Sequence, residues 1–312
     1  MDYPGHRRNR DRPRSNTRSA DESVDADDSD AAVVRSQSGP SLGPADVAFL
    51  AAIPAILVGV FSLPKPLRVS LGLSYLQPTA LTAYTSHFVH LERTHLLANL
   101  LVFLAVVPFA LLVSVKSGRR RRFYLVAFTF LTVFPLVFSG LNVLFPRPRL
   151  GFGFSGVNLA FVGYLPHVLA DRLGRDGPES TPVADSVLPL AFFLGTVIVA
   201  VRMGLSMLDS VPLAAHTPLL AAGIGSILSI VVFAHPIAAR LRRGDASLSE
   251  LFPPSVAFGA LLFVLMLVIA FPHVSPADGT ILNLFVHFLG YSFGFLVPYV
   301  AFRLLAVEID PE

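Results

Sequence analysis

The stretch Gly151–Gly163 reads GFGFSGVNLAFVG and places one serine, Ser155, in a Gly-x-Ser-Gly turn at the start of an apolar helix. The first backbone N–H groups of a helix have no partner inside that helix, so with the positive helix end they suit a negatively charged oxygen. Gly153 and Gly156 allow the backbone to turn and a peptide to approach it closely. A serine that serves only helix packing is the alternative interpretation, so the stretch needs support from elsewhere in the chain.

The composition is that of a membrane protein. Of the 312 residues 53% are hydrophobic and 14% are charged, whereas a soluble domain carries about 25% charged residues. The chain has no cysteine, which excludes disulfide bonds and thiolate metal sites. The net charge of +3 is small, and we expect a lipid bilayer and no nucleic acid as the surroundings of this chain.

Eight apolar segments are long enough, or nearly so, to cross a bilayer, which takes about 20 helical residues. They are residues 46–63, 95–115, 123–145, 155–171, 186–208, 211–234, 254–272 and 280–304. The fourth is short, which is tolerable if its outer end lies inside the protein below a water-filled cavity. We therefore predict an all-α multi-pass membrane protein with about eight transmembrane helices.

The two ends of the chain are polar. Residues 1–45 combine arginines with an acidic stretch and few large apolar side chains, which predicts a disordered cytoplasmic tail. Contact of these arginines with anionic lipids is the alternative. The transmembrane domain is expected to span residues 46–306, and residues 307–312 are expected to form a short cytoplasmic tail.

Basic residues gather in loops that fall on one side of the membrane if the N-terminus lies on that side too. They are Lys116–Arg122, Arg172, Arg175, Arg240, Arg242, Arg243 and Arg303. The positive-inside rule then predicts that both termini are cytoplasmic, in a protein of the cell membrane. Arg202, near the outer end of the fifth segment, is expected to snorkel outward.

The eighth segment carries the candidate general base, His287. A histidine inside a hydrocarbon span is costly, which makes it a functional candidate by default. A neutral imidazole can accept a proton, as a general base must. Since the fourth and eighth segments both run from outside to inside, His287 and Ser155 are predicted to lie at similar depth. A histidine bonded to a neighbouring carbonyl is the alternative.

Small residues line one face of each of these two segments. Gly156, Ala160 and Gly163 share a face of the fourth segment, and Gly290 and Gly294 follow His287 on one face of the eighth. Such faces let two helices pack closely. They would allow the serine hydroxyl and the imidazole to come within hydrogen-bonding distance.

The stretch 84–101 offers candidate oxyanion donors. His95 and Asn99 are four residues apart and share a helical face, and both side chains can donate to an oxyanion. A metal site formed by His87, His90 and His95 is the alternative. Their spacing matches no recognised metal motif and the chain has no thiolate, so we expect neither a metal nor a cofactor.

Taken together, three stretches make the chain resemble the rhomboid family of intramembrane serine proteases. The motifs are S-x-F-x-H-x4-H-x3-N, G-x-S-G with a glycine eight residues after the serine, and H-x2-G-x3-G, in the order that the family has. The matching residues are Ser86, Phe88, His90, His95 and Asn99, then Gly153, Ser155, Gly156 and Gly163, then His287, Gly290 and Gly294.

The resemblance implies a Ser–His dyad that cuts membrane proteins in or just outside a transmembrane segment. Ser155 would attack the peptide carbonyl, and His287 would take its proton and return it to the leaving amine. The anion would be held by the Ser155 N–H, the Asn99 amide and the His95 side chain. His90 would order the first outer loop, and the glycines of the three motifs would support the site. The oligomeric state stays open.

The chain departs from the family in three respects. The family core has six helices with the histidine on the sixth, so the two additional segments between serine and histidine predict a six-helix core plus two. The loop after the first segment lacks a Trp-Arg pair, and the position four after the serine, aromatic in some members, is Leu159. A catalytically inactive relative that binds membrane clients, and a transporter, are the alternative functions.

Overall fold

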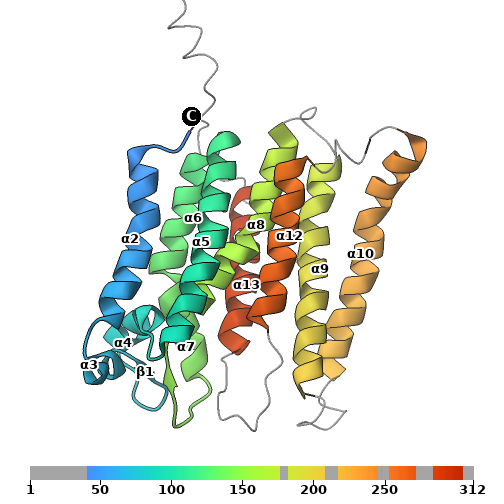
Figure 1. Ribbon diagram of the computed structural model, residues 1–312. Coiled ribbons are helices and arrows are strands. Elements are labelled where there is room, and N and C mark those ends of the chain that lie inside the picture. Colours follow the sequence, from blue (N-terminus) through green and yellow to red (C-terminus); the bar gives the residue numbers. More distant parts are fainter. Residues whose placement is uncertain are drawn as a thin grey trace, which may run out of the picture. The chain divides into compact units, whose positions relative to one another are not determined.

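The computed structural model describes residues 41–175, 182–207, 217–244, 247, 253–271 and 284–304. These residues are mostly helical, and the predicted all-α multi-pass fold is confirmed (Figure 1). Of the two predicted tails, residues 1–40 and 307–312 lie outside the described residues.

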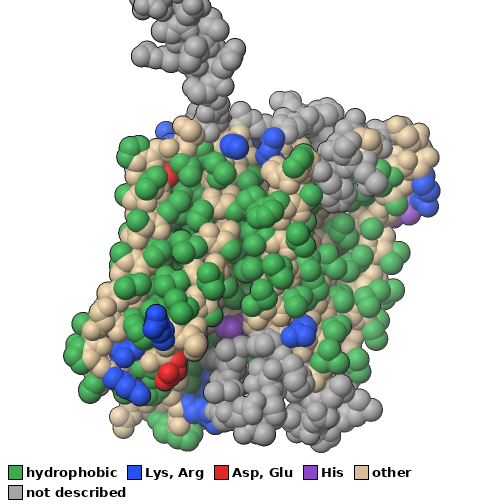
Figure 2. All heavy atoms as spheres, viewed as in Figure 1, with side chains coloured by type: hydrophobic (Ala, Val, Ile, Leu, Met, Phe, Trp, Pro, Cys, Tyr) green, Lys and Arg blue, Asp and Glu red, His purple; other side chains and the backbone are tan. Residues whose placement is uncertain are grey.

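Within the described residues, each of the eight predicted segments is mainly helical. The helices are α2 (Pro44–Phe61), α5 (Arg93–Lys116), α6 (Arg120–Thr132), α7 (Phe134–Val143), α8 (Ser155–Arg175), α9 (Pro182–Met207), α10 (Thr217–Arg243), α12 (Pro254–Ala270) and α13 (Leu284–Tyr299), which continues into the π-helical turn Val300–Leu304. Six helical stretches, with α6 and α7 counted as one, are long and apolar enough to cross a membrane. Hydrophobic side chains cover the middle of the face in Figure 2, and Lys and Arg gather towards its upper and lower edges.

The third predicted segment is broken in two at Val133, and Pro135 explains the break. A proline has no N–H, so it cannot donate to the carbonyl four residues earlier, which here belongs to Leu131. The hydroxyl of Tyr84 donates to this carbonyl instead, at 3.1 Å. The break is therefore stabilised by a side chain from the loop between α2 and α5.

Helix α8 is the centre of the bundle. Every side chain from Gly156 to Ala170 is buried, and α5, α9, α12 and α13 all pack against it. Phe161 of α8 lies in a cluster of aromatic rings with Phe123 and Phe130 of α6. A helix with protein on all sides needs little hydrophobicity of its own, which explains why this segment is the least apolar of the eight.

The two additional helices are α9 and α10. Helix α9 packs against α8 and α12, and α10 packs against α9 on the side away from the bundle (Figure 1). The other helices, with α6 and α7 as one span, form a six-helix core. The predicted architecture of a six-helix core plus two is thus observed, and α12 and α13 complete the core.

One end of the bundle carries short elements that the sequence did not predict. They are α3 (Lys65–Ser70), β1 (Leu73–Ser74), α4 (Ala80–Thr85), the 3-10 turn η1 (Ser86–Phe88) and β2 (Leu150–Gly151). Strands β1 and β2 pair antiparallel, with Leu73 opposite Gly151. This pairing ties the loop after α2 to the turn that leads into Ser155.

The opposite end of the bundle carries the ion pairs. Arg122 at the start of α6 binds both carboxylate oxygens of Asp171 on α8 at 2.9 Å. Asp46 of α2 accepts a 2.7 Å hydrogen bond from Tyr124 and lies 3.3 Å from the Arg120 guanidinium. These contacts fasten α2, α6 and α8 together at the end where the chain has its arginine-rich loop.

Candidate active site

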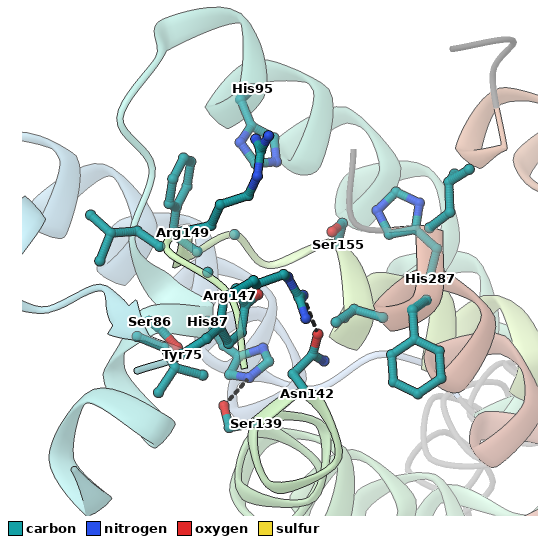
Figure 3. Close-up of a pocket in the computed structure, with 18 of the residues that line it drawn as sticks. Tyr75, Ser86, His87, His95, Ser139, Asn142, Arg147, Arg149, Ser155 and His287 are labelled. Atoms are coloured by element: carbon teal, nitrogen blue, oxygen red, sulfur yellow. Dashed lines mark hydrogen bonds between the residues drawn. The ribbon is translucent and has the colours of Figure 1, made fainter. Parts of the chain in front are cut away.

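A cavity of about 1020 Å³ lies at the end of the bundle that carries the strand pair. Its walls come from the loops at this end of the bundle and from α5, α7, α8 and α13 (Figure 3). Polar and charged residues that line it are Tyr75, Ser86, His87, Glu92, Thr94, His95, Ser139, Asn142, Arg147, Arg149, Ser155 and His287. Four of the predicted site residues, Gly153, Ser155, His287 and His95, thus meet at one cavity.

Ser155 is the first residue of α8, and the turn before it depends on Gly153. Gly153 has a φ of +115°, a backbone conformation that residues with a side chain rarely adopt. A Cβ there would come within 2.6 Å of the His95 ring. Its N–H donates to the carbonyl of Ser86 at 3.0 Å. The glycine therefore allows the backbone to pass close beside His95 and to present Ser155 to the cavity.

His90 holds the same turn from beneath. Its Nε2 accepts a long hydrogen bond from the N–H of Phe154, at 3.5 Å, and its own carbonyl accepts one from Arg68 at 2.7 Å. Burial, and then the nearby His95, lower the pKa of His90 to about 3. A neutral ring nitrogen can accept a hydrogen bond from a backbone N–H, so His90 links the loop between α2 and α5 to the residue before Ser155.

Helices α8 and α13 touch backbone to backbone. A side chain at Gly290 would clash with the Gly156 carbonyl, and one at Gly294 would clash with the backbone of Ala160. Gly163 on α8 faces the carbonyl of Tyr291 in the same way. The two additional helices therefore do not separate α8 from α13.

His287 is 5% exposed and has a defined hydrogen-bond partner. Its Nδ1 lies 2.7 Å from the carbonyl oxygen of Ala270, the last residue of α12. Since a carbonyl oxygen only accepts, Nδ1 carries the proton, and in the neutral ring Nε2 is left as an acceptor. Figure 3 shows the imidazole on the side of the cavity towards Ser155. Among the described residues, no hydrogen bond joins the two side chains.

An aromatic ring contacts His287 although the expected position does not supply one. Leu159 is buried beneath Gly290 of α13. The ring of Phe271, at the end of α12, instead meets the imidazole edge-on, with centroids 5.9 Å apart and planes at 89°. The aromatic partner of the histidine thus comes from α12 and not from α8.

The two predicted oxyanion donors lie in different surroundings. His95 lines the cavity, whereas Asn99 is 4% exposed and is not part of the cavity wall. The Asn99 amide donates to the His95 carbonyl at 3.0 Å, and its oxygen accepts from Asn158 of α8 at 3.1 Å. Asn99 therefore lies one turn below the wall, held between α5 and α8.

His87 and Ser139 form a buried pair in the cavity wall that the sequence analysis did not identify. Ser139 donates to the Ala83 carbonyl at 2.6 Å, so it accepts from His87 Nε2 at 3.0 Å. Burial lowers the pKa of His87 to about 4. In the described part of the chain, no three His, Asp or Glu residues cluster as metal ligands would.

Arg147 and Asn142 also line the cavity but were not among the site residues predicted from the sequence. The guanidinium donates to the Asn142 oxygen at 3.0 Å and lies over the Tyr75 ring, 3.9 Å from its centre. Ser139 and Asn142 were detectable in principle, because they are polar residues three apart in an apolar segment. The contact with Tyr75 crosses between two loops and has no local signal.

The fold and the cavity define a multi-pass helical membrane protein whose polar groups converge at one end of the bundle. The chain belongs to the rhomboid family of intramembrane proteases, since residues 77–235, just over half of its length, match the Rhomboid domain. Comparisons with curated proteins and with solved structures give no significant match. The matched region contains Ser155 and ends within α10, so it is the structure that brings α13 to α8.

Proposed function

We propose that this protein is an intramembrane serine endopeptidase in which Ser155 is the nucleophile and His287 the general base. The observation that carries the proposal is the hydrogen bond from His287 Nδ1 to the Ala270 carbonyl. It fixes the tautomer, so Nε2 is the nitrogen that can take a proton, and the ring lies in the same cavity as Ser155.

The reaction follows the logic of a serine hydrolase without an acidic third member. Ser155 Oγ attacks the scissile carbonyl carbon while its proton passes to His287 Nε2. The imidazolium then protonates the leaving amine, which leaves an acyl-enzyme, and a water molecule releases the acid with His287 again acting as base. The Ala270 carbonyl orients the ring and stabilises its positive charge, as the buried carboxylate does in a triad.

The developing oxyanion is held by donors around the start of α8. The N–H of Ser155 has no helical partner, and the His95 side chain lies in the cavity wall. The Asn99 amide has two N–H groups, and one of them donates to the His95 carbonyl. The other is the donor that we assign to the oxyanion. Gly153 and His90 support the turn, and Gly156, Gly163, Gly290 and Gly294 support the contact between α8 and α13.

The substrates are membrane proteins that can bring an extended stretch of chain into the cavity. The arginine-rich loop lies at the opposite end of the bundle, so the positive-inside rule supports cytoplasmic termini and a cavity that faces the outside of the cell membrane. Water can enter from that side. A transmembrane segment is cut in or just beyond its outer part, where weak helix formers loosen it.

The proposal is tested with the purified protein in detergent, a fluorophosphonate probe and a transmembrane peptide. The wild type should be labelled and should cleave the peptide, and Ser155→Ala should do neither. Ser229→Ala removes a hydroxyl that bonds within α10 and serves as the matched control with wild-type activity. Labelling that persists in Ser155→Ala would show that another residue is the nucleophile. A folded wild type that neither reacts nor cleaves would support the client-binding alternative.

A further inference from the structure

The carbonyl of Ala270, the last residue of α12, and that of Phe271, which follows it, accept hydrogen bonds from two different helices. Carbonyl groups in the final turn of a helix have no partner inside it and need donors from outside. Ala270 O accepts from His287 Nδ1 of α13 at 2.7 Å. Phe271 O, one residue further along, accepts from Arg202 Nε of α9 at 2.8 Å. The end of α12 is therefore held between α9 and α13.

We infer that Arg202 is a positioning residue for the general base, acting through the end of α12. This inference rests on the proposed function. Arg202 binds the carbonyl of Phe271, one residue beyond Ala270. It thereby fixes the backbone next to the carbonyl that orients His287. The additional helix α9, which the six-helix core does not contain, thereby contributes to the active site without reaching the cavity.

The chemistry of an arginine suits this position. A cation stabilises the negative end of a helix, and a charged donor makes a stronger hydrogen bond to a carbonyl than a neutral one. An arginine within a membrane-spanning helix is costly, which marks it as a functional candidate. We expected Arg202 to snorkel outward, but it is half-buried and binds the backbone of α12.

The ring of Phe271 adds a second contact between the end of α12 and His287. It is 1% exposed and meets the imidazole of His287 edge-on. Arg202 thus holds the backbone of the residue whose side chain packs on the base, while the preceding carbonyl bonds to that base. A displacement of this turn moves both contacts of His287 at once.

Helix α9 also contacts α13 directly, one turn beyond His287. The hydroxyl of Tyr291 donates to the Phe192 carbonyl at 2.7 Å, and the two rings are stacked, 5.9 Å apart with planes at 9°. A Cβ at Gly195 would clash with this hydroxyl. Since Tyr291 already fixes α13 to α9, the loss of Arg202 leaves the helix packing in place and affects the end of α12.

The first test compares Arg202→Met with Arg202→Lys and measures kcat and KM per folded molecule. Methionine keeps the length of the side chain and removes the donor. We expect Arg202→Met to lower kcat about 10-fold to 100-fold with little change in KM, since small displacements of a catalytic group have large effects on rate. Arg202→Lys should recover most of kcat, because lysine keeps the charge and a donor. Arg240→Met on α10 is the matched control and should behave as the wild type.

The second test needs no activity. The 15N chemical shifts of His287 in histidine-labelled protein, identified by comparison with His287→Gln, report which ring nitrogen carries the proton. The wild type should hold the proton on Nδ1, and Arg202→Met should show a mixture of both tautomers. An unchanged tautomer, or a wild-type kcat in folded Arg202→Met, would overturn the inference. If the wild type shows no Ser155-dependent turnover, the proposed function fails, and the 15N measurement decides the inference alone.

Discussion

Helices α10 and α13 have a similar apolar character but differ in how deeply they are buried in the bundle. Each is a long apolar helix that follows α8 along the chain, and each carries one histidine, His235 and His287. Within the described residues, 50% of the residues in the apolar stretch of α13 are buried, against 6% of those in the apolar stretch of α10. Helix α10, which is nearer to Ser155 in the sequence, packs on α9 at the edge of the bundle. Helix α13, which is farther away in the sequence, packs against α8.

The surroundings of their glycines distinguish the two helices. A Cβ at Gly294 of α13 would clash with the backbone of α8, whereas a Cβ at Gly225 of α10 would meet nothing within 4 Å. Hydrophobicity brings both helices into the bilayer equally well. The small residues decide which one can approach α8 closely enough to share a site with it.

The largest expected effect contrasts the two histidines. If His287 is the general base, His287→Ala should lower kcat by about 10⁴-fold or more, as the loss of the catalytic histidine does in serine proteases. His235→Ala should leave kcat and KM within about twofold of the wild type, since the side chain is exposed. Cleavage of a transmembrane peptide measures both. A strong loss of activity in His235→Ala would mean that α10, not α13, supplies the base.

The next effect tests Asn99 of α5, which lies behind the cavity wall. Asn99→Ala should lower kcat about 10²-fold or more if the amide holds the oxyanion, with KM little changed. Ser114→Ala removes another buried polar group of the same helix, far along α5 from the cavity. This control should affect the thermal unfolding midpoint and not kcat. Equal turnover in Asn99→Ala and the wild type would assign Asn99 to packing.

The glycines give a smaller effect with opposite signs. Gly294→Ala should destabilise the protein by about 1–3 kcal/mol, because the added methyl group overpacks a closed interface. Gly225→Ala should stabilise it by about 0.5–1 kcal/mol, because alanine is the better helix former where space is open. Unfolding in detergent measures both changes. Similar shifts in the two variants would contradict the difference in packing between α13 and α10.

The smallest effect is a dependence of stability on pH. Burial lowers the pKa of His87 to about 4 and that of His90 to about 3. Above pH 6.5 or so the unfolded and folded states are both neutral; below it the unfolded histidines bind protons first, so stability falls with pH until the folded pKa is reached. Between about pH 7 and 5.5 each histidine should cost about 1 kcal/mol.

Variants of these histidines check the assignment. Unfolding measured across this pH range should show a smaller slope in His87→Gln than in the wild type. His235→Gln on α10 is the control and should keep the wild-type slope, because this side chain is exposed. An unchanged slope in His87→Gln would mean that the outer loop does not hold this ring neutral.

The sequence predicted much of this arrangement because its signals are local. Hydrophobic length identifies each span close to the observed helix ends, except that α10 ends at Arg243 and not at residue 234. The spacing of Gly156 and Gly163, and of Gly290 and Gly294, indicates faces for close packing, and α8 and α13 do pack through them. The catalytic roles of Ser155, His287, Asn99 and His95 remain predictions.

What the sequence could not supply are contacts made by backbone groups across large separations. The acceptors for His287 and Arg202 are carbonyl oxygens at the end of α12, and every residue has such a group, so no residue type marks them. The break at Val133 had a signal in Pro135, although a proline by itself does not say whether a helix bends or ends. The strand pair of two residues is too short for a pattern.

The complete burial of α8 has a consequence for how this protein is made. Because α8 contains Asn158 and His167 and is not apolar enough to count among the six spanning stretches, it depends on neighbouring helices for its place in the bilayer. One of those neighbours, α13, is synthesised more than a hundred residues later. The serine and the histidine thus meet only after α13 has been synthesised. Under the proposed mechanism, the nascent protein therefore cannot cut other chains before that helix is inserted.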